Sequence, residues 1–444
     1  MQYYSNKSGY GGYLMVISNK DSQLKRNFPT LIILIISGAF IYALPYFRNY
    51  YYDIFVESFN ITNTQMGALG SIYGITSTVS FCFGGFCADR WPTKNLLSIS
   101  LITTGLLGFV LLTYPPYSVV FLIHALWGFT CILTFWNALI ITIRSLASSD
   151  EQGKAFGFFE GGRGIVNILQ SAFVLGLFGY LSKVKSEQIA LSGVITTYSL
   201  VCILLGIMVY FALGKQANAN VAKKSDEKKI IDKKVLLKIL KMPTTWLNAI
   251  IIFTSYAVII SYFYITPYTT SVFGVTAVIA AALGYFSQYC RPIGCFATGI
   301  IADKIGSSKM MAILYVVLIA GVVGVIFVPG QPSMIWLLLL FIAAMYTSMY
   351  GIQSLHYAIM EEGDYPLEIT GTATAIIMPI GYSSEFIAPI VAGICLDTWP
   401  GAQGYKVFFT ILTLTCTSGL FAVVAWMRVT KEKRMLMQKN KKNV

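Results

Sequence analysis

The chain has 444 residues, of which 56% are hydrophobic and only 11% are charged, and its formal net charge is +13. That composition is too apolar for an ordinary soluble protein, so a soluble globular class is excluded. The positive balance could indicate nucleic-acid binding, but Lys and Arg gather in both tails, in one mid-chain segment and in short loops between apolar runs. Such a distribution sets the orientation of a membrane protein, so no nucleic-acid partner is expected.

Long apolar runs recur along the chain, and about 20 apolar residues suffice to span the hydrocarbon core of a bilayer. The sequence offers about a dozen such runs, which predicts an all-α membrane protein with several passes through the bilayer. The eight cysteines all fall inside apolar runs and have no metal-ligand neighbours. They are therefore expected to be small packing residues, and no metal site or cofactor is predicted.

The first half opens with residues 1–27, which are polar and predict a disordered cytoplasmic tail. Six transmembrane spans are then expected at 28–50, 64–88, 95–112, 119–143, 155–181 and 189–213. Pro45 predicts a kink in the first span, because proline removes a helix hydrogen bond and clashes with the preceding turn. Residues 28–214 would form an N-terminal bundle of these six helices.

The second half follows a basic cytoplasmic linker at residues 215–243. Within this linker, residues 230–240 have apolar side chains at helical spacing, which predicts an amphipathic helix at the membrane surface. Six further spans are expected at 244–269, 275–302, 309–327, 334–360, 370–396 and 407–426. Residues 244–428 would form a C-terminal six-helix bundle, followed by a basic cytoplasmic tail at 429–444.

One charged loop motif occurs twice, about half a chain apart. Each copy ends an apolar run with glycine, three residues, aspartate and a cation: Gly85, Asp89 and Arg90 in the first copy, and Gly299, Asp303 and Lys304 in the second. Charges are costly inside the hydrocarbon, so both loops are expected at a membrane face. The repeat predicts two similar bundles.

Ionisable residues inside the spans are the candidates for function, because a charge at membrane depth is costly. We expect a cationic site for an anionic substrate at Arg48, Arg163 and Arg291, with Glu160 and Glu385 as proton-coupling groups. The alternative is that these charges form structural ion pairs. Arg163 and Glu160 stand three residues apart, a spacing at which two side chains on a helix can pair.

Tyrosines cluster on the first span of each half, and their hydroxyl groups can line a polar cavity. We expect Tyr42, Tyr46 and Tyr262 to face such a cavity. The other tyrosines of these spans are expected in the interfacial aromatic belt or in packing.

The spans, the long linker and the duplicated motif together resemble the major facilitator superfamily, over nearly the whole chain after residue 27. The resemblance implies twelve helices in two pseudo-symmetric six-helix bundles and a substrate cavity between them, used by rocking alternating access. It also implies that Asp89 and Asp303 accept hydrogen bonds that lock the outward-facing state, while Gly85 and Gly299 allow close helix approach. The alternative is that the motif charges only set the topology.

Within that superfamily, the chain resembles the organophosphate:phosphate antiporters, such as the glycerol-3-phosphate transporter. Arg48 and Asn49 late in the first span and residues 64–70 at the start of the second carry this likeness. The likeness implies that Arg48 binds phosphate. Those antiporters also use an arginine in the seventh span, which is missing here, so the expectation broadens to a phosphorylated or carboxylated organic anion.

The sequence therefore predicts a secondary active transporter of a small organic anion, driven by protons or by exchange. The alternatives are a carrier for an amino acid or another zwitterionic or neutral solute, and a transporter-like sensor. No catalytic set and no phosphate-binding loop are present in the sequence, so an enzyme is not expected. The expected setting is a bacterial inner membrane, with a monomeric multi-pass protein whose two termini are cytoplasmic.

Overall fold

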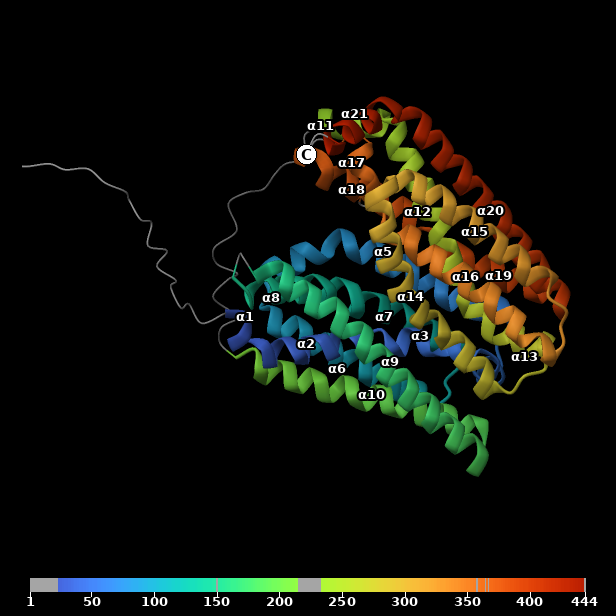
Figure 1. Cartoon of the computed structure of the whole chain (residues 1–444). Coiled ribbons are helices and arrows are strands. Elements are labelled where there is room, and N and C mark those ends of the chain that lie inside the picture. The colour runs from blue at the N-terminus through green and yellow to red at the C-terminus, as the bar shows by residue number, and fades with distance from the viewer. Residues whose placement is uncertain are drawn as a thin grey trace, which may run out of the picture.

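The computed structural model describes residues 23–148, 151–214, 233–356, 358–363, 365 and 367–442. Two groups of helices, one from each half of the chain, lie against each other and diverge toward the end that carries α1, α11 and α21 (Figure 1). We call this end, where both copies of the loop motif also lie, the loop-motif end. The opposite end, where the halves meet, is called the closed end.

The first group follows the predicted spans with several internal breaks. Its elements are α1 (Gln23–Arg26), α2 (Phe28–Phe40), α3 (Ala43–Tyr50), α4 (Tyr52–Phe59), α5 (Asn63–Arg90), α6 (Thr93–Leu111), α7 (Tyr117–Gly128), the π-helix η1 (Phe129–Trp136), α8 (Asn137–Ser145), α9 (Gln152–Val184) and α10 (Glu187–Ala212).

The second group repeats the layout. Its elements are α11 (Lys233–Lys241), α12 (Pro243–Ser261), the 3-10 helix η5 (Tyr262–Tyr264), α13 (Ile265–Phe273), α14 (Ala277–Ile305), α15 (Ser307–Phe327), the 3-10 helix η6 (Pro332–Met334), α16 (Ile335–Ser354), α17 (Ala358–Glu362), α18 (Leu367–Tyr382), α19 (Ser384–Thr398), α20 (Ala402–Val429) and α21 (Lys431–Lys442).

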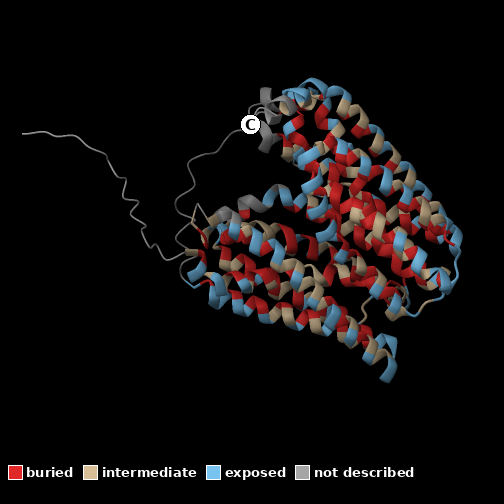
Figure 2. Cartoon of the chain, viewed as in Figure 1, coloured by how far each residue is buried: buried red, intermediate tan, exposed pale blue. Residues whose placement is uncertain are grey.

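Exposed residues lie on the outer surfaces of both groups, and buried residues concentrate where helices pack together (Figure 2). Many exposed positions are large and apolar, including Phe211, Phe296 and Trp336. A water-facing surface would not carry so many of them, whereas the hydrocarbon of a bilayer accommodates them without cost. The burial pattern therefore agrees with a membrane-embedded bundle.

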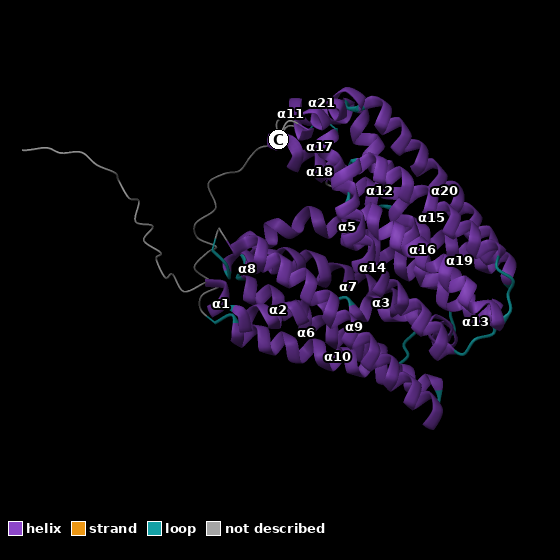
Figure 3. Ribbon diagram, viewed as in Figure 1, coloured by secondary structure: helices purple, strands orange, loops and turns teal. Residues whose placement is uncertain are grey.

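Regular structure in the described ranges is helical throughout (Figure 3). Nine helical stretches among the described residues are long and apolar enough to cross a membrane, and the bent pair α2 and α3 makes a tenth. The long helices α5 and α14 are less apolar, because glycines and polar side chains interrupt their apolar runs. Both face the opposite half, since α5 packs against α19 and α14 against α9.

The first span bends by 44° between α2 and α3, about one turn before Pro45. Proline has no N–H to bond the carbonyl four residues earlier, which here belongs to Ile41. The thiol of Cys131 lies 3.5 Å from that carbonyl oxygen and satisfies it instead. The kink expected from Pro45 therefore lies at residues 41–42, next to Tyr42.

The last residues of the predicted N-terminal tail are ordered and hydrogen-bonded to other parts of the chain. Residues 1–22 lie outside the described part of the chain, but Gln23–Arg26 form a helical turn tied to the loop after α8. The Asn27 side chain donates a 2.9 Å bond to the Leu146 carbonyl, and Glu151 accepts one from the Leu24 N–H at 3.1 Å. The prediction of a disordered tail up to residue 27 was therefore wrong for residues 23–27, because polar groups of the α8–α9 loop hold them.

Two other basic segments contain helices. The predicted linker helix is present as α11 at Lys233–Lys241, while residues 230–232 lie outside the described part. The basic C-terminal tail continues as α20 up to Val429 and then as α21 at Lys431–Lys442.

Candidate functional site

A cavity of about 290 Å³ lies between the two halves of the chain. Residues at the α2–α3 break, in η5 and in the first turn of α19 all line it. Its polar and aromatic lining residues are Tyr42, Tyr46, Tyr50, Arg163, Asn167, Gln170, Ser171, Tyr198, Tyr256, Tyr262, Phe263, Tyr285, Gln288, Arg291, Tyr350, Gln353 and Glu385.

Glu385, the acidic residue that lines the cavity, belongs to the second half of the chain and is hydrogen-bonded by a residue of the first half. Tyr46 of α3 donates a 2.6 Å hydrogen bond to Oε1 of Glu385 on α19. The Tyr46 ring also stacks on Phe263, with ring centroids 5.6 Å apart. Tyr46 and Glu385 therefore form a polar contact between the halves at the wall of the cavity.

Arg163 of α9 brings a positive charge to the cavity and is partly neutralised. Its Nη1 lies 3.5 Å from Oε1 of Glu160, the pairing that the spacing of three residues allows. The guanidinium also lies over the rings of Trp136 and Phe159, at 5.2 and 5.4 Å from their centroids. Glu160 is half-exposed, so this pairing is weak and leaves Arg163 able to attract an anion.

Arg291 of α14 brings a second positive charge from the other half. Its guanidinium lies 5.8 Å from the centroid of the Tyr350 ring. Among the described residues, no carboxylate lies within ion-pair distance of Arg291. The side chain is exposed, so its charge is available to a ligand in the cavity.

The lining contains polar groups that the sequence analysis did not select. Tyr42, Tyr46 and Tyr262 line the cavity, and so do five further tyrosines: Tyr50, Tyr198, Tyr256, Tyr285 and Tyr350. Four amides also face it: Asn167, Gln170, Gln288 and Gln353. An amide inside an apolar span was the signal that could have found the second group, since buried polar groups need partners.

Arg48 is not among the cavity-lining residues. It is 4% exposed and lies toward the closed end, where Nη1 donates to the Asn49 side chain at 3.0 Å and to the Met66 carbonyl at 3.4 Å. Its Nε has no hydrogen-bond partner among the described residues. Substrate binding by Arg48 stays a prediction, and in this conformation a ligand in the cavity does not reach it.

The closed end is joined by polar contacts between the halves. Asp397 at the end of α19 accepts hydrogen bonds from the start of α5: from the Asn63 N–H at 3.1 Å, the Asn63 side chain at 2.9 Å and the Thr64 N–H at 2.7 Å. Thr270 of α13 donates to the carboxylate of Asp53 on α4. An acidic group at a helix N-terminus satisfies free N–H groups and the helix dipole.

Glycines allow α5 and α19 to pack closely at this end. A Cβ added at Gly67 would lie 2.3 Å from the Pro389 carbonyl oxygen, and one at Gly393 would lie 2.4 Å from the Asn63 carbonyl oxygen. Both distances are far inside van der Waals contact. The closed arrangement therefore requires residues without a side chain at these two positions.

The loop-motif end is arranged differently. Asp303 and Lys304 are exposed, and a Cβ at Gly299 would meet nothing within 4 Å. No close helix approach is present at Gly299 in this conformation, because the halves diverge at this end (Figure 1). The lock expected at the two motifs in the outward-facing state stays a prediction. The side chain of Asp89 and the surroundings of Gly85 lie outside the described part of the chain, and Arg90 is exposed.

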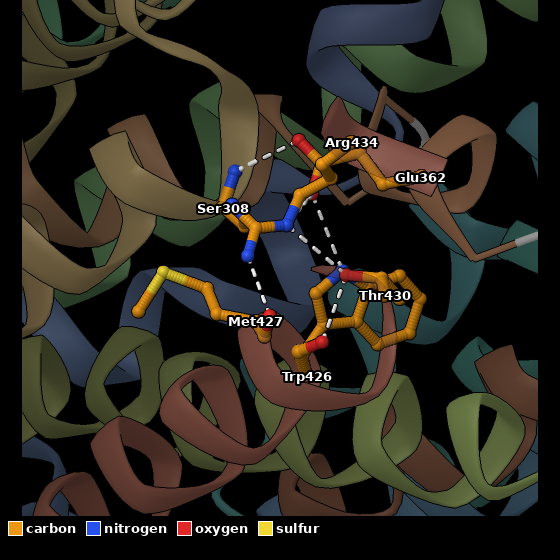
Figure 4. Close-up of polar contacts among 6 residues, drawn as sticks. All are labelled: Ser308, Glu362, Trp426, Met427, Thr430 and Arg434. Carbon is orange, nitrogen blue, oxygen red and sulfur yellow. Dashed lines mark hydrogen bonds and ion pairs between the residues drawn. The ribbon is translucent and has the colours of Figure 1, made fainter. Parts of the chain in front are cut away.

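A buried acidic residue that the sequence analysis missed lies beside the second motif. Glu362 of α17 accepts from the Ser308 N–H at the start of α15 at 3.2 Å and from the Trp426 indole at 3.4 Å (Figure 4). Arg434 of α21 lies 3.9 Å from the same carboxylate and also donates to the Met427 carbonyl and the Thr430 hydroxyl. Glu362 therefore accepts a free N–H group at the start of α15 and also binds the C-terminal helix.

This architecture, two helical groups around a polar cavity that is sealed at one end, is that of a secondary transporter. Residues 28–389 match the model of the Major Facilitator Superfamily. The chain belongs to this superfamily.

The chain is also similar to curated relatives and to solved structures. The chain is 30% identical over 417 residues to inner membrane protein YihN of Escherichia coli K12, covering 93% of this chain and 98% of that protein. It is 29% identical over 390 residues to inner membrane protein YqcE of the same strain, covering 86% and 90%. A variant of the nucleoside transporter NupG has a TM-score of 0.73 at 15% identity, covering 91% of this chain and 99% of that one.

A bacterial homologue of the human lysosomal transporter Spinster, in an inward-facing and occupied conformation, has a TM-score of 0.70 at 13% identity, covering 92% of this chain and 98% of that one. At these identities the structural matches establish the fold alone. The finer resemblance to organophosphate:phosphate antiporters stays a prediction.

Proposed function

We propose that the chain transports a small organic anion, phosphorylated or carboxylated, by alternating access. The observation that carries the proposal is the placement of Arg163 and Arg291, which come from opposite halves and line one cavity in which Glu385 is the only acidic lining residue among those described. An anion between two guanidinium groups gains charge-assisted, bidentate hydrogen bonds. A ligand that contacts both halves also favours the arrangement in which both contacts are made, so its binding is coupled to the relative movement of the halves.

The uncharged part of the substrate is expected to carry hydrogen-bonding groups. The amides of Gln288 and Gln353 and the hydroxyl groups around the cavity offer donors and acceptors on several sides. A purely apolar body would leave these groups unpaired, which costs free energy. A hydroxylated or amidated organic acid therefore fits the lining better than a fatty acid.

The loop-motif end is proposed to be cytoplasmic, in an inner membrane like that of the curated relatives. Basic residues gather at this end in α11, α21 and the motif loops, as the positive-inside rule requires. The described conformation would then be inward-facing, with its closed end toward the exterior.

Glu385 is proposed as the proton-coupling group, with Glu160 as a second carrier. When Glu385 is ionised, the bond from Tyr46 is charge-assisted and favours contact between the halves at the cavity wall. Protonation weakens that bond and so changes the balance between the two arrangements. Exchange of one anion for another remains the alternative driving mode.

A carrier for a zwitterionic solute is the second candidate. One observation favours it: Glu160 pairs with Arg163, so the charges of the two arginines and the two glutamates near the cavity balance. An amino acid could then place its carboxylate at Arg291 and its ammonium group at Glu385. Neutralising Arg291 should weaken binding of both an anion and such a zwitterion, whereas neutralising Glu385 should weaken binding of the zwitterion alone, because only the zwitterion places an ammonium group there.

The test is ligand-dependent thermal stabilisation of the purified full-length protein. The panel contains inorganic phosphate, sugar phosphates, mono- and dicarboxylates, amino acids and nucleosides. Arg291→Gln is compared with Arg428→Gln, which removes an exposed arginine at the end of α20, away from the cavity. We expect an anion to stabilise the wild type and Arg428→Gln but not Arg291→Gln. Equal stabilisation of all three proteins by a neutral solute would overturn the anion proposal.

Binding without flux would indicate a sensor instead. Counterflow in proteoliposomes loaded with the stabilising ligand separates the two cases. A transporter accumulates labelled ligand transiently, whereas a sensor does not.

A further inference from the structure

A second hollow lies outside the cavity between the halves, on the lipid-facing side of the first half. It is a crevice of about 410 Å³ between α6 and α10, lined by Asn95, Ser98, Ile99, Ile102, Ile207, Tyr210 and Phe211. Both helices are candidate membrane spans. The transport cycle proposed above makes no use of this crevice.

The walls of the crevice are apolar and open to the bilayer. Ile99 is 60% exposed and Phe211 is 75% exposed, although both stand on helices that pack tightly against each other. The helices cross closely because position 206 is glycine: a Cβ there would lie 2.7 Å from the Ile102 side chain. The crevice lies beside this crossing, and its apolar lining comes from both helices: Ile99 and Ile102 of α6, and Ile207 and Phe211 of α10.

The polar end of the crevice carries a cation. Lys94, at the start of α6, extends over the Tyr210 ring with Nζ 4.8 Å from the ring centroid. In the described part of the chain, no carboxylate pairs with Lys94. Asn95, the next residue along α6, and Tyr210 line the crevice and add hydrogen-bonding groups to this end of it.

We propose that this crevice binds one anionic phospholipid, with its phosphate at Lys94 and one acyl chain along Ile99, Ile207 and Phe211. A cation at the headgroup level above an apolar slot matches the two chemical ends of such a lipid. A protein partner is a poorer fit, since the walls of the crevice lie within the spans. Lipid bound here bridges α6 and α10 and stabilises the first half by mass action.

The experiment is native mass spectrometry of the full chain in detergent with equal amounts of phosphatidylglycerol and phosphatidylethanolamine. Wild type is expected to retain one phosphatidylglycerol in preference to the zwitterionic lipid. Lys94→Gln should lower that retention about fivefold, as loss of one lysine near a lipid headgroup implies. Lys309→Gln, which removes the exposed lysine at the equivalent start of α15, should leave retention unchanged.

A second variant keeps the proposal falsifiable if Lys94→Gln folds poorly. Ile207→Trp fills the slot without touching the charge, and it should reduce retention of both lipids. Soluble glycerol phosphate, added in excess, should not displace the bound lipid, because it has no acyl chain. Equal retention of both lipids by wild type, unchanged retention in both crevice variants, or displacement by glycerol phosphate would each overturn the proposal.

Discussion

Tyr46 on α3 and Glu385 on α19 are joined by a 2.6 Å hydrogen bond that crosses from one half of the molecule to the other. The bond lies at the wall of the cavity, and both residues line it. In the proposed transport cycle, ligand binding, protonation of Glu385 and the relative position of the halves would therefore all act on this pair of side chains.

Removing the hydroxyl of this pair should shift the conformational balance. Tyr46→Phe keeps the ring that packs against Tyr73 and Phe263 but loses the bond to Glu385. A hydrogen bond to a charged group contributes about 1.5 kcal/mol, so opening of the closed end should become roughly tenfold more favourable. Distances between spin labels on cysteines at positions 57 and 403, in a background without native cysteines, report that opening. An unchanged distance distribution in Tyr46→Phe would contradict the role of the pair.

Asp397 should act as a latch at the closed end. Asp397→Asn keeps the size of the side chain but removes the charge that accepts three bonds from Asn63 and Thr64. This loss is expected to destabilise the closed arrangement by about 1–3 kcal/mol relative to the open one. The same spin-label pair should show a larger open population. Equal populations in the variant and wild type would mean that the glycine-lined packing of α5 and α19 holds this end alone.

Glycine at position 67 should be required for closure but not for folding. A Cβ there meets the Pro389 backbone, which cannot rotate away as a side chain can. Gly67→Ala should therefore hold the closed end apart and stop transport, while the protein still inserts and purifies. Gly157→Ala is the matched control, because a Cβ at Gly157 meets nothing within 4 Å. Transport at the wild-type rate by Gly67→Ala would rule out tight closure in the cycle.

The contacts of Glu362 with Ser308, Trp426 and Arg434 should stabilise the second half. Arg434→Gln removes the cation beside a carboxylate that is 5% exposed, and a buried charge without its partner is costly. We expect a loss of about 1–3 kcal/mol in unfolding free energy, seen as a lower melting temperature. Lys431→Gln, an exposed position on the same helix, should change little. If the two variants melt alike, α21 is not held through Glu362.

Asp53 should make closure depend on pH. Burial raises the pKa of the Asp53 carboxyl above its ordinary value; the bond from Thr270 opposes this, and nearby Glu187 adds to it. A raised pKa means that the closed arrangement binds the proton more tightly than the open one. The stabilisation that this proton gives to the closed arrangement is therefore greatest below the ordinary pKa of a free aspartate. It is lost as the pH rises through the raised pKa of Asp53. Asp53→Asn should abolish this trend in the spin-label distances; persistence of the trend would assign it to another group.

The helical membrane architecture could be predicted from the sequence. Span length, apolar runs and the repeated loop motif are each visible in a short stretch of sequence, because the bilayer imposes its requirements locally. Counting residues along a span placed Arg291 and Glu385 at mid-span, and both line the cavity. Hydrogen bonds between residues of different halves could not be predicted in this way. Asp397 and Asn63 are separated by more than three hundred residues, and their meeting depends on the tertiary packing of α5 against α19. Glu362 was missed for the same reason, since its partners come from α15, α20 and α21.

Arg48 illustrates the limit of position-based reasoning. Its place late in the first span predicts an anion site, yet in this conformation the side chain is enclosed near Met66 and Asn49. Gly70 lies against Arg48 and also against Pro389 of α19, so the surroundings of Arg48 change when α5 and α19 separate. A static sequence position does not say in which conformation a side chain meets the substrate.

The most direct test of the account is exchange of the stabilising anion in proteoliposomes containing wild type, Arg163→Gln, Arg291→Gln or Arg428→Gln. The account predicts exchange by wild type and Arg428→Gln, and at least a tenfold lower kcat/KM in each cavity variant, as expected when one charge-assisted contact of about 1.5 kcal/mol is lost. Undiminished anion exchange by both cavity variants would contradict the claim that the substrate binds between these two arginines.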